Sequence, residues 1–143
     1  MTADAPAALL GLDVGDRRIG VAVARLDVRL PRPLLTLDAG DGAFQRIHEL
    51  ADEHGAAAVV VGWPRGMAGQ HTDQTRRVEE FVAGLRAALD LPVHLQDEAL
   101  TSQKAEAELS ARRKPYSRED IDALAATFIL EDYMREYGGS NDA

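Results

Sequence analysis

The sequence predicts an α/β fold, a mixed five-stranded sheet with helices packed on it. The first observation is that three short apolar runs of strand length open the chain. The second is that segments of helical periodicity then alternate with two further strand-length runs. At 143 residues, the chain has the length of one domain. We therefore predict a single domain over residues 1–143, ordered at about 9–135, with a tail at 136–143.

Five short apolar runs are the predicted strands: residues 9–14, 19–24, 34–37, 57–61 and 92–96. The first two runs flank the turn-like segment 15–18, so we expect them to form a β-hairpin. The third run follows Pro31 and Pro33, which favours an edge position because proline is tolerated there.

Four segments are the predicted helices. Residues 41–54 have helical spacing and end before Gly55, and the next helix begins after Thr72, which is a good N-cap. This second helix has the clearest apolar stripe, namely Val78, Phe81, Val82, Leu85 and Leu89. A third helix is expected from Thr101 to about residue 113, although its apolar face is thin.

The last helix is predicted to begin after Ser117, which has capping-box spacing to Asp120. Its apolar stripe is Ile121, Leu124, Ala125, Phe128 and Ile129. Residues 110–118 before it are polar and basic, as in a mobile loop. Residues 62–69 hold three glycines and a proline and are also expected to form a loop.

Charge and composition limit the possible partners. A net charge of −8 argues against indiscriminate coating of nucleic acid, which depends on neutralising phosphates. Any nucleic-acid contact must therefore come from local basic clusters, for which the candidates are Arg17, Arg18, Arg65, Arg76, Arg112, Arg113 and Lys114. Without cysteine the chain has no disulfide or thiolate zinc site. We expect a cytoplasmic protein with no membrane partner, because no signal peptide or bilayer-length apolar run is visible.

Asp13 is the first unusual acidic residue, because it interrupts an apolar strand. Strand alternation places Asp13 on one face with Gly11 and Gly15, and the second strand presents Gly20 and Ala22 there. A buried carboxylate is costly unless it is paired or coordinated. We therefore expect this face of the hairpin to be open for a ligand. The alternative is an aspartate that pairs with the arginines of the turn.

Two further carboxylates occupy unusual positions. Glu98 follows a predicted strand, at the end where ligands of α/β sheets usually bind, and alternation groups it with His94 and Gln96. The alternative for Glu98 is a solvated turn. Asp122 shares a helix face with Ala126 and Ile129, so its carboxylate is expected to point inward or along the rim. The alternative for Asp122 is a favourable position near the positive end of the helix dipole.

Asp13, Glu98 and Asp122 are therefore the candidate catalytic and metal-binding residues. Each lies on an element expected in or against the same sheet. Carboxylate oxygens are the ligands that Mg²⁺ and Mn²⁺ prefer, and two ions roughly 3.5–4 Å apart can activate water and stabilise a leaving oxygen. We predict a site for two such ions.

Four groups of residues occur in an order that is specific to one family. They are Gly11-Leu12-Asp13-Val14-Gly15 with Arg18-Ile19-Gly20-Val21-Ala22, Val60-Val61-Gly62-Trp63-Pro64 with Gly66-Met67 and Gly69, Asp97-Glu98 with Leu100-Thr101, and Ile121-Asp122-Ala123 with Ala125-Ala126. In these groups the chain resembles the YqgF or RuvX family of Holliday-junction-resolvase-like nucleases over residues 9–133. The resemblance implies a ribonuclease H-like fold and a metal-binding active site at Asp13, Glu98 and Asp122.

The resemblance also implies a nucleic-acid substrate, and it leaves two possibilities open. One is the 5′ end of the precursor of small-subunit ribosomal RNA, and the other is a four-way DNA junction, for which a homodimer would be expected. Ala99 departs from the family, which usually has arginine after the glutamate, and residues 114–117 differ from the family's glycine- and lysine-rich segment. The missing charge at position 99 bears either on substrate contact or on the orientation of the carboxylate, whereas the change at residues 114–117 bears on substrate contact.

The sequence allows more than one interpretation of two residues and of the function. Arg65 precedes a helix N-terminus and is either a phosphate contact or an exposed loop arginine, and Trp63 is expected to pack rather than to stack on a base. A metal-dependent endonuclease is the leading hypothesis. The first alternative is a catalytically inactive nucleic-acid-binding module of the same fold. The second is a phosphotransferase of the actin and sugar-kinase type, although such proteins need two domains of this kind.

Overall fold

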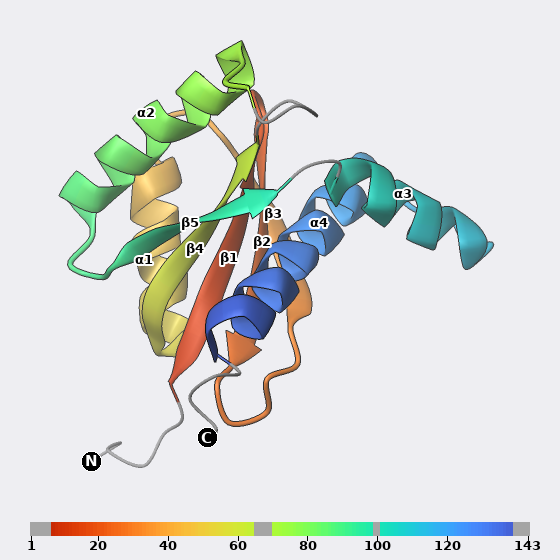
Figure 1. Ribbon diagram of the computed structural model, residues 1–143, viewed down its shortest axis with the longest axis horizontal. Helices are drawn as coiled ribbons and strands as arrows, with labels where there is room; N and C mark the ends of the chain where they lie inside the picture. Colours follow the sequence, from red (N-terminus) through yellow and green to blue (C-terminus); the bar gives the residue numbers. More distant parts are fainter. Residues whose placement is uncertain (1–6, 65–69, 99–100, 139–143) are drawn as a thin grey trace.

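A five-stranded sheet forms the centre of the structure, a computed structural model that describes residues 7–64, 70–98 and 101–138 (Figure 1). Its strands lie in the order β3-β2-β1-β4-β5. Their bounds are Ala8–Val14 (β1), Arg18–Arg25 (β2), Arg32–Asp38 (β3), Ala56–Pro64 (β4) and Val93–Glu98 (β5). The first three strands pair antiparallel, and β4 pairs parallel with both β1 and β5. The predicted mixed sheet of five strands is therefore confirmed.

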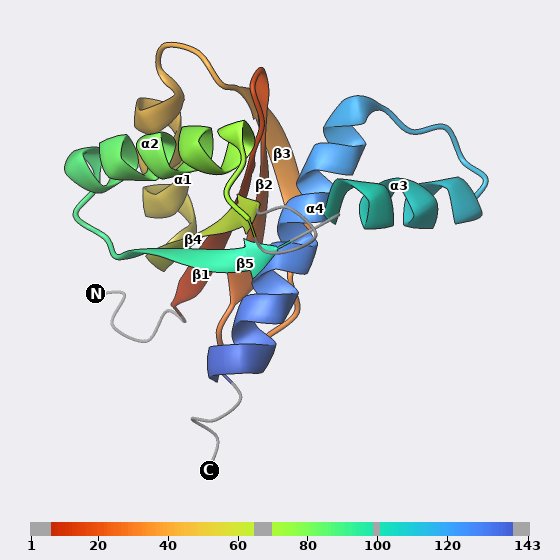
Figure 2. The same cartoon turned by 45° about the horizontal axis from the view of Figure 1, so that its top comes forward.

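Helices cover both faces of the sheet. Helices α1 (Ala43–His54) and α2 (Asp73–Ala88) lie on one face, and α4 (Arg118–Tyr133) crosses the other (Figure 1). Helix α3 (Thr101–Ala111) packs on α4 and projects away from the sheet, as Figure 2 shows. The chain continues from α4 into a π-helical turn, η1 (Met134–Gly138). Within the described ranges, none of the helices combines the length and apolarity that crossing a bilayer requires.

The larger core lies between the sheet and helices α1 and α2. Fully buried residues of β1 and β2, including Leu10, Leu12 and Ile19, pack there against Ile47 of α1 and Leu85 of α2. These strand residues alternate with the smaller side chains of the opposite face, as the sequence predicts.

The predicted helix boundaries are largely confirmed. Gly55 ends α1 with a φ of 64°, a left-handed conformation that glycine adopts without strain. Thr72 caps α2 by accepting a hydrogen bond from the backbone N–H of Thr75 at 3.2 Å. At the start of α4, Ser117 and Asp120 accept from each other's backbone N–H groups, the predicted capping box.

The face of the hairpin that we expected to be open for a ligand is covered by α4, so this prediction is wrong. Glycines on that face allow the helix to approach the strands closely. An added Cβ would lie 1.9 Å from the carbonyl oxygen of Asp122 at Gly20, and 2.5 Å from Leu130 Cγ at Gly11. The small side chains therefore make room for a helix backbone, which carries Asp122 over the strands.

The apolar stripe predicted for the last helix divides between two partners. Leu124 and Ala125 pack against Ala105 and Leu109 of α3. The side facing the sheet is formed by Ile129, which belongs to the predicted stripe, together with Ala126 and Leu130, which do not. Helix α4 is therefore buried on two sides, which a single stripe does not describe.

Three boundaries differ from the predictions. Strand β4 continues through Trp63 to Pro64, which we expected in a loop, because it pairs there with the end of β5. Residues 136–138, which we predicted in the tail, belong to η1, where Glu136 accepts a hydrogen bond from Gln96 Nε2 at 3.0 Å. Helix α3 ends at Ala111, before the basic residues that the prediction included in it.

The contact between α4 and Gly20 predicts a specific sensitivity to substitution. Gly20→Ala places a methyl group against a backbone carbonyl, and overpacking of this kind costs about 1–3 kcal/mol, here toward the upper end. Gly40→Ala is the matched control, because nothing lies within 4 Å of its added Cβ, and a change below about 0.5 kcal/mol is expected. Urea unfolding measures both, and equal stability of the two variants would contradict the close contact.

Candidate active site

Asp13 lies near the end of β1, where it faces Gly20 of β2 in the strand register. Its side chain is on the face of the sheet that α4 covers, together with Leu9 and Gly11. Burial raises the pKa of Asp13 to about 7, and the negative charge of Asp122 adds to the shift. The charged form is disfavoured in this environment, so Asp13 is suited to a nearby cation.

Asp122 comes to the same place from α4. Arg18 Nε, at the start of β2, donates a hydrogen bond to Asp122 Oδ2 at 2.6 Å. Only 16% of the Asp122 side chain and 29% of the Arg18 side chain are exposed, so this ion pair is partly shielded from solvent. Arg18 therefore binds Asp122 rather than Asp13, and it offsets part of the repulsion between the two carboxylates.

Glu98 reaches the same face of the sheet from β5. Its neighbours in strand alternation identify that face, because the His94 ring stacks on Tyr133 of α4 and Gln96 binds Glu136 of η1. Glu98 is 7% exposed, and burial raises its pKa to about 7 even though Lys104 opposes the shift. The predicted grouping of Glu98 with His94 and Gln96 is confirmed.

The oxygen atoms of this face fit a hard divalent cation in their chemistry. Among the described residues, Gln96 Oε1 and Glu98 Oε1 are buried side-chain oxygens without a hydrogen-bond partner. Gln96 Nε2 donates hydrogen bonds to Glu136 Oε2 and to the carbonyl oxygen of Asp97. These two bonds hold the amide in place. Buried acceptors of this kind require a donor or a cation, and carboxylate and amide oxygens are ligands of Mg²⁺ and Mn²⁺.

The three carboxylates form a pair and a single residue rather than one tight group. Asp13 and Asp122 lie together, and Glu98 lies beyond the intervening strand β4. Since neighbouring strands are about 4.8 Å apart, the backbones of β1 and β5 are about 10 Å apart. In the part of the chain that the structure describes, no three acidic or histidine side chains are placed to hold one ion jointly.

The basic residues predicted to bind nucleic acid fall into separate locations. Arg17 and Arg18 line a cavity of about 490 Å³ with Arg118 and Asp122. Arg112 and Lys114 line a different groove, and the side chain of Arg113 is exposed beside it. Arg76 pairs with Asp73 on the exposed side of α2. Arg65 and Ala99 lie outside the described residues.

The structure confirms the expectation for Trp63 and adds two residues to the site. Trp63 packs as expected, with its Nε1 donating to Glu79 Oε2 at 3.0 Å and its ring meeting the edge of His71. Gln96 and Glu136 were not identified as site residues. Strand alternation places Gln96 on the same face as Glu98, so the sequence contained a signal for Gln96. Glu136 contacts Gln96 only because η1 packs against β5.

Comparison with known proteins identifies the family. A family model described as RuvX, Holliday junction resolvase, matches residues 7–136. The chain belongs to the RuvX family. The family resemblance predicted from the four groups of residues is therefore confirmed.

Similar RuvX proteins and solved structures span nearly the whole chain. A protein of Chloroflexus aggregans is 44% identical over 130 residues, covering 88% of this chain and 92% of its own length. One of Azotobacter vinelandii is 38% identical over 135 residues, covering 92% and 95%. Both carry the name pre-16S rRNA nuclease.

The solved structures confirm the predicted ribonuclease H-like fold. Thermus thermophilus RuvC in complex with a Holliday junction substrate has a TM-score of 0.55 at 18% identity, covering 92% of this chain and 96% of its own. The fowlpox virus Holliday junction resolvase has a TM-score of 0.53 at 11% identity, covering 90% and 98%.

The raised pKa values predict how the stability of the metal-free protein depends on pH. The folded-state pKa values of Asp13 and Glu98 are about 7, above the ordinary 3.8 and 4.5. A raised pKa gives a stability contribution that is complete below the unfolded-state pKa and is lost as pH rises through the folded-state pKa. The free energy of unfolding should therefore fall by at least about 1 kcal/mol from about pH 5 to about pH 8 in the presence of a chelator.

Asp13→Asn removes one of the two titrating groups and should flatten this dependence. Asp90→Asn, at an exposed position after α2, is the control and should leave the dependence as in the parent protein. Urea unfolding at a series of pH values measures the slope. A dependence as steep in Asp13→Asn as in the parent would contradict the raised pKa of Asp13.

Proposed function

We propose that this RuvX protein is an endonuclease that hydrolyses phosphodiester bonds with divalent cations, Mg²⁺ or Mn²⁺, held by Asp13, Glu98 and Asp122. The observation that carries the proposal is that Asp13 and Glu98 lie on the sheet face that α4 covers, while Asp122 of α4 lies beside Asp13. Two of them are buried with pKa values of about 7, and Glu98 Oε1 has no described hydrogen-bond partner. Titrating carboxylates of this kind are typical of functional sites.

The proposed chemistry divides between the cations and the side chains. When bound, a pair of divalent cations lowers the pKa of water and neutralises charge on the phosphate and the leaving oxygen. Asp13 and Glu98 must give up their protons to become ligands, and pKa values of about 7 allow this near neutral pH. Arg18 holds Asp122 through one oxygen, which orients that carboxylate toward the sheet.

The arginines beside Asp122 are proposed to hold the backbone of the substrate. Arg17, Arg18 and Arg118 line the cavity that Asp122 borders, so a phosphate bound there lies next to the acidic residues. Phosphate contacts position a nucleic acid without reading its sequence. Selection between substrates must therefore depend on the shape or the sugar of the nucleic acid.

For the substrate, we propose the 5′ end of the small-subunit ribosomal RNA precursor. This proposal rests on the relatives at 44% and 38% identity, which are named pre-16S rRNA nucleases. A four-way DNA junction is the second candidate, because the family is described as a Holliday junction resolvase. Two symmetric cuts in a junction would require two copies of the chain. Either activity would take place in the cytoplasm.

A catalytically inactive nucleic-acid-binding module of the same fold is the alternative function. It has the same basic residues but no need for buried carboxylates, which are costly to maintain without a cation. Retention of Asp13, Glu98 and Asp122 on one face of the sheet favours the enzyme.

Neutral replacements of the three acids test the proposed activity. Asp13→Asn, Glu98→Gln and Asp122→Asn are each expected to lower the cleavage rate at least about a hundredfold, because each removes charge that holds the cations. Purified protein is assayed on single-stranded ribosomal precursor RNA and on a four-way DNA junction, with Mg²⁺ or Mn²⁺ and with a chelator. The chelator should abolish cleavage by the parent protein.

The control for this assay is Asp52→Asn, which also removes one negative charge but lies on α1, across the sheet from the site. Its cleavage rate should equal that of the parent protein. Parent-like rates in Asp13→Asn and Glu98→Gln would overturn the metal-dependent mechanism on either substrate.

A further inference from the structure

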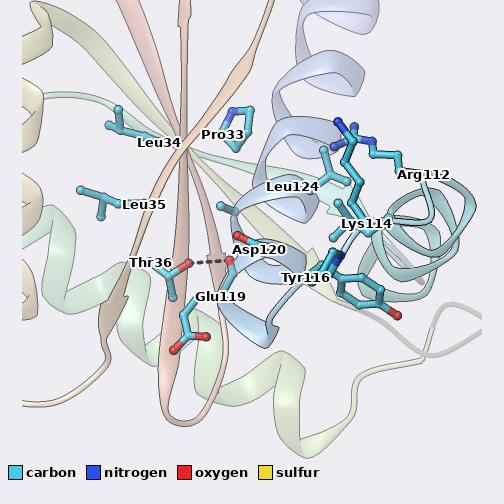
Figure 3. Close-up of a pocket in the computed structure, with 13 residues that line it drawn as sticks. Pro33, Leu34, Leu35, Thr36, Arg112, Lys114, Tyr116, Glu119, Asp120 and Leu124 are labelled. Carbon is cyan, nitrogen blue, oxygen red and sulfur yellow. Dashed lines mark hydrogen bonds between the residues drawn. The ribbon is translucent and has the colours of Figure 1, made fainter.

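A second groove, of about 450 Å³, lies between the edge strand β3, the end of α3 and the start of α4 (Figure 3). Its apolar part is formed by Leu109 of α3, by Ala123 and Leu124 of α4, and by residues 33–35 of β3. Basic side chains and one aromatic ring from the segment between α3 and α4 complete it. The groove is separate from the cavity beside Asp122.

We propose that this groove binds an unstacked nucleotide of single-stranded RNA, with its base against Tyr116 and its phosphates on Arg112 and Lys114. The inference rests on the proposed nuclease function and adds a binding site for single-stranded RNA outside the cavity beside Asp122. Three properties of the groove support it, namely an accessible ring, an arrangement of charge and a position next to the candidate active site.

The ring of Tyr116 is suited to stacking because it is accessible and held in place. Tyr116 is 37% exposed, and its hydroxyl shares a hydrogen bond of 2.9 Å with Ser110 Oγ at the end of α3. Figure 3 shows Tyr116 next to Lys114. Bases that stack on aromatic rings must be free of a duplex, so the ring favours single-stranded nucleic acid.

The charges of the groove orient the nucleotide backbone. Arg112 and Lys114 stand on the side of α3, whereas Glu119 and Asp120 stand on the side of α4. Arg112 pairs with Glu108 at 2.6 Å, but both side chains are about half exposed, so a phosphate can replace the carboxylate at little cost. The phosphates are thus expected on the basic side, away from the acidic residues.

The acidic side of the groove favours ribose over deoxyribose. A carboxylate repels a phosphate but accepts a hydrogen bond from a hydroxyl group. The 2′-hydroxyl is the donor that distinguishes RNA from DNA. The backbone here is held by the bond from Thr36 Oγ1 to the carbonyl of Glu119 at 2.9 Å, drawn as a dashed line in Figure 3. This turn of helix is therefore fixed, and Asp120, whose Oδ2 accepts from the Ser117 N–H, keeps its other carboxylate oxygen as an acceptor.

The residues that border the groove are neighbours in the sequence of those that border the candidate active site. Glu119 and Asp120 border the groove, whereas Arg118 and Asp122 border the cavity with Arg18. All four residues belong to the start of α4. A single strand that crosses this turn of helix can therefore contact Tyr116 while a nearby phosphate lies beside Asp122.

Binding of a short fluorescent single-stranded RNA, measured by anisotropy in the presence of a chelator, tests the groove without cleavage. Tyr116→Ala should weaken binding about tenfold or more, as loss of one base–aromatic stack does, whereas Tyr116→Phe keeps the ring and should bind like the parent. Lys114→Ala should weaken binding and reduce its salt dependence. Arg46→Ala, on α1, is the control for loss of one positive charge and should have no effect.

The same assay compares RNA with DNA of equal sequence and with the paired duplex. The parent protein should bind single-stranded RNA more tightly than either, and Tyr116→Ala should reduce that difference. Equal affinity of Tyr116→Ala and the parent, or equal affinity for RNA and DNA, would overturn the proposal. Self-association of the parent that Tyr116→Ala abolishes would assign the groove to a second copy instead, which also overturns it.

Failure of this inference is distinguishable from failure of the proposed function. Parent-like binding by Tyr116→Ala with loss of cleavage in Asp13→Asn would refute only the groove. Weaker binding by Tyr116→Ala with parent-like cleavage in Asp13→Asn would refute only the metal-dependent mechanism. Circular dichroism and thermal unfolding of Tyr116→Ala and Tyr116→Phe establish that both variants are folded.

Discussion

The close contact between α4 and the sheet determines where the acidic residues of this RuvX protein lie. Glycines at positions 11, 20 and 62 remove the side chains that would hold the helix away, and an added Cβ at any of them would lie within 2.5 Å of an α4 atom. Gly20 also faces Asp13 in the strand register. The same contact that packs the helix therefore places Asp122 next to Asp13. Stability and site geometry depend on one interface.

This arrangement places negative charge where it is costly. Burial and the neighbouring Asp122 raise the pKa of Asp13, and burial raises that of Glu98, so in the absence of a cation the fold favours their neutral forms. Arg18 compensates for one carboxylate only. Buried carboxylates of this kind lower the stability of the fold locally. They are expected at functional sites, where the rest of the structure supplies the missing stability. The apolar core under α1 and α2 supplies that stability on the opposite face of the sheet.

Most of the fold could be predicted because its signals are local. Gly55, Thr72 and Ser117 mark helix ends by their own backbone and side-chain chemistry, and strand alternation assigned the faces of β1 and β5. The errors concern contacts between distant segments. Small residues on the hairpin indicated a close approach, but the sequence does not distinguish a ligand from a helix there. Strand β4 extends to Pro64 because it pairs with the end of β5, and η1 is held by the contact of Glu136 with Gln96 of β5. A local sequence pattern does not indicate such partners.

The acidic character of the chain as a whole makes the position of its arginines decisive. With a net charge of −8, long-range attraction to nucleic acid is unfavourable, so binding must come from contacts short enough to act despite the overall field. Screening at physiological salt limits interactions between exposed charges to roughly 8 Å, which separates a local basic cluster from the acidic remainder of the surface. The clusters at Arg17 and Arg18 and at Arg112 and Lys114 both adjoin the start of α4. The two groups of basic residues proposed to contact nucleic acid therefore both lie beside the helix that carries Asp122.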